Sequence, residues 1–121
     1  MKNVKTLVYG GSEKPERYSN KAIRMLLKHG HPVVSIGQKA GQVETCRIQT
    51  GQPAFEGIDT ITLYLGPQHQ ASIYTYCLDL KPRRILFNPG TENEEFKKLA
   101  EEQGIVCQEA CTLVLLSTGQ Y

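Results

Sequence analysis

Short apolar runs rich in β-branched residues alternate with helical segments along the whole chain. The runs cover residues 4–9, 33–36, 60–65, 84–87 and 105–107. This alternation is typical of a parallel sheet, because parallel neighbours must be joined by a crossover that is usually a helix. Right-handed crossovers place those helices on both faces of the sheet. The pattern therefore predicts a three-layer, doubly wound α/β fold with about five mainly parallel strands.

Capping residues and apolar spacing predict the helices between these runs. Ser19 predicts the start of a helix that Gly30 ends, with a buried face of Ala22, Ile23, Leu26 and Leu27. A capping box over 91–94 predicts a second helix that Gly104 ends, with a buried face of Phe96, Leu99 and Ala100. A third helix is expected over 68–80. The polar segment 37–57 is expected to hold one short strand near 46–48, and 110–116 a closing helix or turn.

Length and composition limit the class of protein. With 121 residues, 40% of them hydrophobic, the chain is expected to form one domain over 1–121 with a core that needs no metal or disulfide. A net charge of +2 without a clustered basic stripe argues against nucleic acid as a partner. No run approaches the ~18 apolar residues of a membrane span. The N-terminal residues lead directly into a strand pattern, so we expect no signal peptide and a cytoplasmic location.

The four cysteines and three histidines do not form a metal-binding pattern. No cysteine pair has CxxC spacing, and the histidines lie far from the cysteines in the sequence. A disulfide framework is not expected in such a chain either. Cys77 and Cys107 fall at apolar positions, where small buried thiols are common. His29 and His31 flank Gly30 and are expected at the surface.

The segment after the first predicted strand carries the clearest functional signal. Gly10-Gly11-Ser12 would let the backbone approach a ligand closely. Unpaired N–H groups at the following helix start favour a phosphate, and Ser19, Lys14 and Arg17 add a hydroxyl and positive charge. The spacing is not GxGxxG, so the dinucleotide fingerprint is absent. Local chemistry alone leaves two readings, a phosphate loop or a plain glycine turn with a solvated charged loop.

An ordered series of short motifs extends this signal over nearly the whole chain. The series resembles the small stand-alone CoA-binding proteins, which are related to the CoA-binding domain of succinyl-CoA synthetase. Its members are Gly10-Gly11-Ser12, Pro15, Arg17, the stretch from Leu26 to Gly30, Ile58-Asp59, Gly66-Pro67, Gly90, Glu95-Phe96, Ala100, Gly104-Ile105 and Cys111. The resemblance implies a Rossmann-like fold that binds coenzyme A.

The resemblance also implies where the ligand would lie. The phosphates of coenzyme A would lie over 10–12, and the adenine end against the end of the second strand. The expected ligand-binding residues are Gly10, Gly11, Ser12, Lys14, Pro15, Arg17, Ser19, Gly37, Gln38, Gly66, Asn88 and Gly90. Three positions depart from the family: the P-V-N-P segment is replaced at 35–38, an arginine is replaced by Leu65, and the Q-x-G segment begins with Asn88.

The sequence favours a non-catalytic binder of coenzyme A or an acyl-CoA, acting as carrier, sensor or partner subunit. One alternative is an enzyme that uses Cys111 or His69 on a CoA thioester or disulfide. Another is a protein that binds a different nucleotide, or that has lost the ligand and serves in interactions. A homodimer or a partner enzyme remains open, because the apolar stretch 113–116 could cover the core or face a second subunit.

Overall fold

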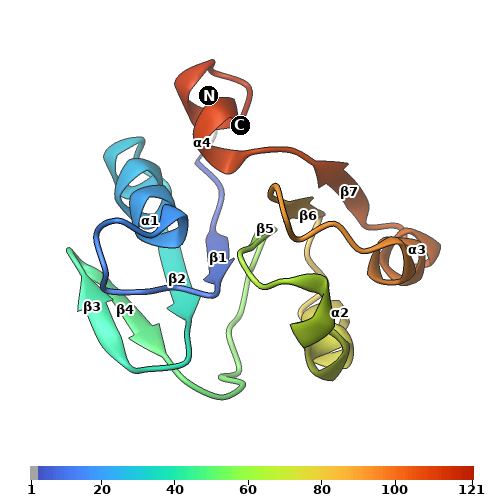
Figure 1. Ribbon diagram of the computed structural model, residues 1–121. Coiled ribbons are helices and arrows are strands. Elements are labelled where there is room, and N and C mark those ends of the chain that lie inside the picture. Colours follow the sequence, from blue (N-terminus) through green and yellow to red (C-terminus); the bar gives the residue numbers. More distant parts are fainter. Residues whose placement is uncertain (1–2) are drawn as a thin grey trace.

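The computed structural model describes residues 3–121. Its seven strands form one sheet in the order β3-β4-β2-β1-β5-β6-β7 (Figure 1). Every neighbouring pair is parallel except β3–β4. The predicted Rossmann-like α/β fold is thus confirmed. The strands are β1 Thr6–Tyr9, β2 Val33–Ile36, β3 Gly41–Val43, β4 Cys46–Gln49, β5 Thr60–Leu63, β6 Arg84–Phe87 and β7 Val106–Glu109.

The strand count differs from the expected five because segment 37–57 forms an antiparallel hairpin. β4 matches the short strand expected near 46–48, and β3 pairs with it from Gly41 to Val43. Glu44 turns the hairpin with a φ of 52°. Only alternate side chains of the hairpin reach the core, namely Val43, Cys46 and Ile48. Three alternating apolar residues in a polar stretch are too weak a pattern to predict two strands.

The two best-defined helices begin at residues other than the predicted caps. α1 spans Tyr18–Lys28, so Arg17 is its N-cap and Ser19 lies buried in its first turn. α3 spans Glu94–Glu102, and its N-cap Asn93 accepts a hydrogen bond from the Phe96 N–H. Leu99 of α3 is 36% exposed, so its assignment to the buried face is wrong.

The helix expected over 68–80 is broken into three pieces. Two 3₁₀ turns, Pro67–His69 and Ala71–Ile73, precede α2, which spans only Tyr74–Asp79. The cause is Gln70, whose fully buried side chain donates to the carbonyls of Leu65 and Thr91 at 2.9 and 2.8 Å. An amide turned into the core satisfies two loop carbonyls there, which a regular solvent-facing helix would leave unpaired.

Helices cover both faces of the sheet (Figure 1). One core joins the sheet to α2 and α3 through Leu7, Leu63, Cys77 and Phe96. The other joins the sheet to α1 and to α4, which spans Thr112–Ser117. This second core includes Val8, Ile23, Leu26 and Leu116. Alternate residues of β1 point to opposite faces, so this single strand belongs to both cores.

A polar cluster lies on the α4 side of the sheet, where the strands begin. Arg84 is only 5% exposed, and its guanidinium lies 4.5 Å from the ring centre of Tyr121. It donates to Thr60 Oγ1 at 3.2 Å and to the Tyr121 carbonyl at 3.1 Å. The Tyr121 hydroxyl pairs with Thr6 Oγ1 at 2.5 Å. Through these contacts the last described residue is anchored to three strands.

His31 belongs to this cluster, so its expected place at the surface is wrong. Its Nδ1 accepts the Val4 N–H at 3.0 Å, and its ring lies 4.9 Å from that of Tyr121. Burial, with added repulsion from His29 and Arg84, lowers the pKa of His31. The imidazole therefore stays neutral in the folded protein under conditions where an unfolded histidine takes up a proton.

This difference predicts that acid weakens the fold through His31. Unfolded His31 binds a proton near pH 6.5 and the folded form binds it only at a lower pH, so the free energy of unfolding should fall as the pH drops from about 7.5 to 5.5. Urea unfolding across this range measures the effect. His31→Asn should flatten the pH dependence, whereas His29→Asn, at an exposed neighbouring position, should keep it. Equal slopes in the two variants would contradict this assignment.

Candidate functional site

The carboxyl ends of β1, β2, β5 and β6 lie at one edge of the sheet. From β1 the chain goes to β2 on one side, and β5 lies on the other side of β1. The position between β1 and β5 is therefore the topological switch point, where open α/β sheets bind ligands. The segments that follow the four strands at this edge are 10–17, 37–40, 64–69 and 88–93.

The first of these segments is fixed to the end of β2 by its backbone. The N–H groups of Gly10 and Gly11 both donate to the Ile36 carbonyl, at 2.7 and 2.9 Å. Gly10 has a φ of 102°, which glycine adopts without strain. The first two amides of the loop are thus already paired within the protein. The backbone N–H groups of the next two residues, Ser12 and Glu13, have no acceptor among the described residues.

Glycine is needed here because three stretches of backbone pack closely. A Cβ on Gly11 would overlap the Ser35 hydroxyl, and a Cβ on Gly37 would overlap the Gly11 carbonyl oxygen. The Ser35 hydroxyl donates to the Val8 carbonyl at 2.8 Å. The serine at 35 and the glycine at 37, which replace family residues, thus form the surface on which the loop rests.

Two residues of α1 hold the other side of the loop. Asn20, only 3% exposed, donates to the Ser12 carbonyl at 2.9 Å and accepts from Arg24 Nε at 2.8 Å. Arg24 also reaches the Pro15 carbonyl at 3.4 Å. Glu13 accepts the Gln42 N–H at 2.9 Å and so connects the loop to β3. The sequence interpretation missed Asn20 and Glu13, because neither belongs to a motif and their partners lie on other segments.

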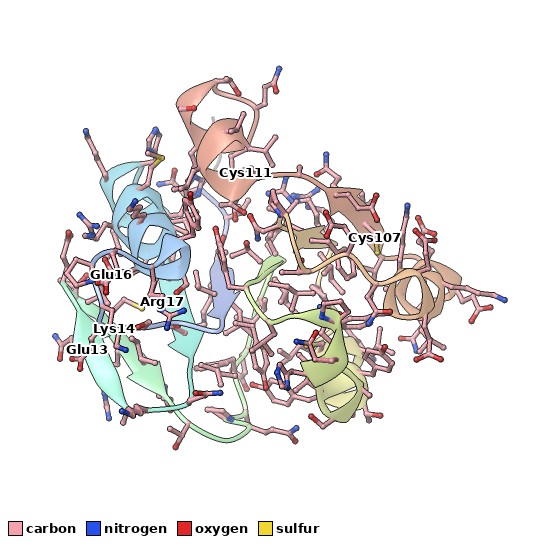
Figure 2. The ribbon with its side chains drawn as sticks, in the orientation of Figure 1. Glu13, Lys14, Glu16, Arg17, Cys107 and Cys111 are labelled. Carbon is pink, nitrogen blue, oxygen red and sulfur yellow. The ribbon has the colours of Figure 1, made fainter. Side chains whose placement is uncertain are left out.

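Two cations and two acids lie around the start of α1 (Figure 2). Its N-cap Arg17 makes no side-chain cap hydrogen bond, and no acidic residue lies in the first turn. The first N–H groups of a helix have no intrahelical partner, and the helix dipole makes this end attractive to anions. Figure 2 shows Lys14 and Arg17 beside the loop, with Glu13 and Glu16 nearby. Gly37 packs against Gly11 of the same loop, whereas Ser19 is only 4% exposed.

The expected ligand-binding residues that follow β5 and β6 take part in the protein's own hydrogen bonds and turns. The Asn88 side chain is buried and fully engaged: it donates to Thr62 Oγ1 and the Leu63 carbonyl, at 2.6 and 2.9 Å, and accepts the Thr112 N–H at 2.8 Å. It braces β5, β6 and α4 together. The Gly90 N–H is paired with Glu92 at 2.9 Å. Gly66 caps the first 3₁₀ turn.

The residues considered for catalysis are not assembled into a reactive group. Cys111 is half-buried at the N-cap of the six-residue α4, apart from the loop before α1 in Figure 2. His69 is exposed, and no hydrogen bond links its ring to an acid among the described residues. Burial raises the pKa of Cys77 to about 12 and that of Cys46 and Cys107 to about 11, so these three thiols stay protonated at neutral pH.

Within residues 3–121, no group of three histidine, cysteine or acidic side chains could hold a metal ion. No helix in this part of the chain is long and apolar enough to cross a bilayer.

Comparison with known families identifies the relationship of the chain. The model of a CoA binding domain family matches residues 4–117. The chain belongs to this family. A crystal structure of an uncharacterized protein is similar over 100% of both chains, with 45% identity and a TM-score of 0.97. A search of curated proteins gave no match.

Two more distant structures share the fold of this CoA binding domain. A hypothetical protein from Pyrococcus horikoshii OT3 has 23% identity and a TM-score of 0.87, covering 97% of this chain and 84% of that one. A protein from Thermus thermophilus has 18% identity and a TM-score of 0.83, covering 98% and 91%.

The close packing under the loop predicts unequal effects of two alanine substitutions. Gly37→Ala should lower the free energy of unfolding by ~1–3 kcal/mol, because its Cβ overlaps a backbone oxygen and the Ile48 side chain. Gly66→Ala is the matched control, since its Cβ meets only the movable end of Gln68. Urea denaturation compares the two. A Gly37→Ala protein as stable as the control would show that the loop does not depend on this contact.

Proposed function

We propose that this chain binds coenzyme A, or an acyl-CoA, through the loop before α1 and acts without catalysing a reaction. The observation that carries the proposal is the start of α1: an uncapped helix N-terminus, two unpaired loop amides and two exposed cations, Lys14 and Arg17, adjoin one another. Membership of a CoA binding domain family supports coenzyme A as the anion that this position attracts.

The hydrogen bonds of the loop refine where the phosphates would bind. Since Gly10 and Gly11 donate to Ile36, their amides serve the fold. The donors left for a phosphate are the amides of Ser12 and Glu13 and the first N–H groups of α1, with Arg17 beside them. The role proposed for Gly10 and Gly11 is therefore close packing. Pro15 stiffens the loop between these two groups of donors, because its ring fixes φ.

The remaining part of the ligand would extend along the carboxyl edge of the sheet. Gly37 and Gln38 follow β2 and adjoin the loop, so they are proposed to meet the adenine end. Gly66 and Gly90 border the opposite side, where the pantetheine arm would lie. Asn88 is proposed to shape that side through its brace and to make no ligand contact, because its amide oxygen and nitrogen are already engaged.

The proposal predicts that one exposed arginine matters and another does not. Arg17→Ala should weaken coenzyme A binding about 10–100-fold, the effect of one hydrogen bond to a charged group. Arg47→Ala removes an equally exposed arginine on β4 and should leave the affinity unchanged. Isothermal titration calorimetry measures both. Equal affinities of the two variants would place the phosphates elsewhere.

Ligand fragments test whether coenzyme A itself is recognised. Coenzyme A at ~100 times its dissociation constant should stabilise the fold by about 2.7 kcal/mol in a thermal-shift assay, and pantetheine, which lacks the nucleotide, should give a much smaller shift. NAD, ATP and FAD, measured in the same assay, test the alternative that the protein binds a different nucleotide. A protein that none of these ligands stabilises would favour the interpretation that the family fold is kept for interactions alone.

A further inference from the structure

α1 and α3 carry opposite charges in the same helical spacing. On α1, Lys21, Met25 and Lys28 follow one another at positions i, i+4 and i+7, which lie on one face of a helix. On α3, Glu95, Leu99 and Glu102 have the same spacing. Seven helical residues rise about 10.5 Å, so the two pairs of charges are equally far apart. Each pair has an apolar residue between its members.

The basic residues of α1 line a shallow groove of about 720 Å³. Its other lining residues are Arg24, Met25 and Leu113 of α4, with Glu44 from the β3–β4 turn. Three cations therefore face one acid, around two half-buried apolar side chains. Lys21 and Lys28 are exposed, whereas Arg24 is held by Asn20.

The acidic row of α3, formed by Glu95, Leu99 and Glu102, carries the opposite charge. Glu95 and Glu102 are exposed, and Leu99 projects between them with 36% of its surface accessible. Glu95 accepts a hydrogen bond from the Tyr74 hydroxyl at 3.1 Å, which orients its carboxylate. Glu94 and Glu101 add two more negative charges, against Lys97 and Lys98. Lys98, three residues after Glu95 and four before Glu102, lies beside the same row, so the helix surface carries a net negative charge around one exposed leucine.

The two surfaces cannot meet within one chain. Figure 1 shows α1 and α3 at opposite ends of the sheet, and they pack on its opposite faces. We propose that the groove on α1 of one copy receives the acidic row on α3 of a second copy. Leu99 enters the groove between Met25 and Leu113. The helices run antiparallel, which places Lys21 opposite Glu102 and Lys28 opposite Glu95 and aligns the helix dipoles favourably.

This contact joins two different surfaces, so it leaves one groove and one acidic row unused at the ends of a pair. Such head-to-tail contacts continue into rings or chains. The charges are exposed, so the association is weak and depends on ionic strength, since screening acts over ~10 Å at 0.1 M salt. Coenzyme A is not required for it. The inference therefore stands apart from the proposed function.

Charge reversal tests the pairing. At low salt and high protein concentration, analytical ultracentrifugation should show species larger than one chain, which revert to single chains at ~0.5 M salt. K21E/K28E and E95K/E102K should each remain single chains. A mixture of these two variants should associate, because K21E/K28E keeps the acidic row and E95K/E102K keeps the basic groove. K39E/R47E, which changes the net charge as K21E/K28E does but lies outside the groove, should still associate.

A second measurement keeps the test independent of charge alone. Leu99→Ser should weaken association of the otherwise unchanged protein, and a carbodiimide cross-linker should join Lys28 of one copy to Glu95 of another. Circular dichroism checks that each variant is folded. The proposal is overturned if the natural protein stays a single chain in low salt, if the two reversed proteins do not associate when mixed, or if association survives both reversals. Capture of nucleic acid by the groove with no self-association would equally overturn it.

Discussion

The contact between the loop after β1 and the end of β2 is the constraint on which the candidate site depends. Gly10 and Gly11 donate to one carbonyl oxygen, that of Ile36, while the Gly11 carbonyl lies against Gly37. No side chain fits between these backbones. The loop is consequently set by β2 before any ligand arrives, and its direction into α1 leaves the helix start uncapped. The two amides without a partner, those of Ser12 and Glu13, lie on this loop.

Buried side-chain amides fix the loops after β5 and β6. Gln70 joins the segment after β5 to the segment after β6, and Asn88 joins the ends of both strands to α4. Each amide satisfies backbone groups that would otherwise be buried without partners. The loops on the two sides of this edge are thus held differently. Glycines in close backbone contact hold one side, and amide side chains that bridge loops hold the other. The edge of the sheet between β1 and β5 lies between them.

The sequence predicts the layers of this fold well, because strand and helix periodicity are local signals. It predicts the glycine turn between β1 and α1 for the same reason, since a glycine pair between a strand and a helix is a local pattern. What it misses depends on distant partners. Asn20 matters through Ser12 and Arg24, Gln70 breaks a helix through carbonyls on two loops, and His31 is buried by Tyr121. None of these pairings leaves a periodic or motif signature in the sequence.

The hydrogen bonds that hold these loops have a consequence for the kinetics of ligand exchange. Gln70 ties the loops after β5 and β6 to each other, and Asn20 with Arg24 ties the loop after β1 to α1. A ligand bound at this edge would therefore meet loops that are already fixed by the fold, rather than close a lid over itself. Pre-organised sites lose little conformational entropy on binding, and their association rates are not limited by a rearrangement.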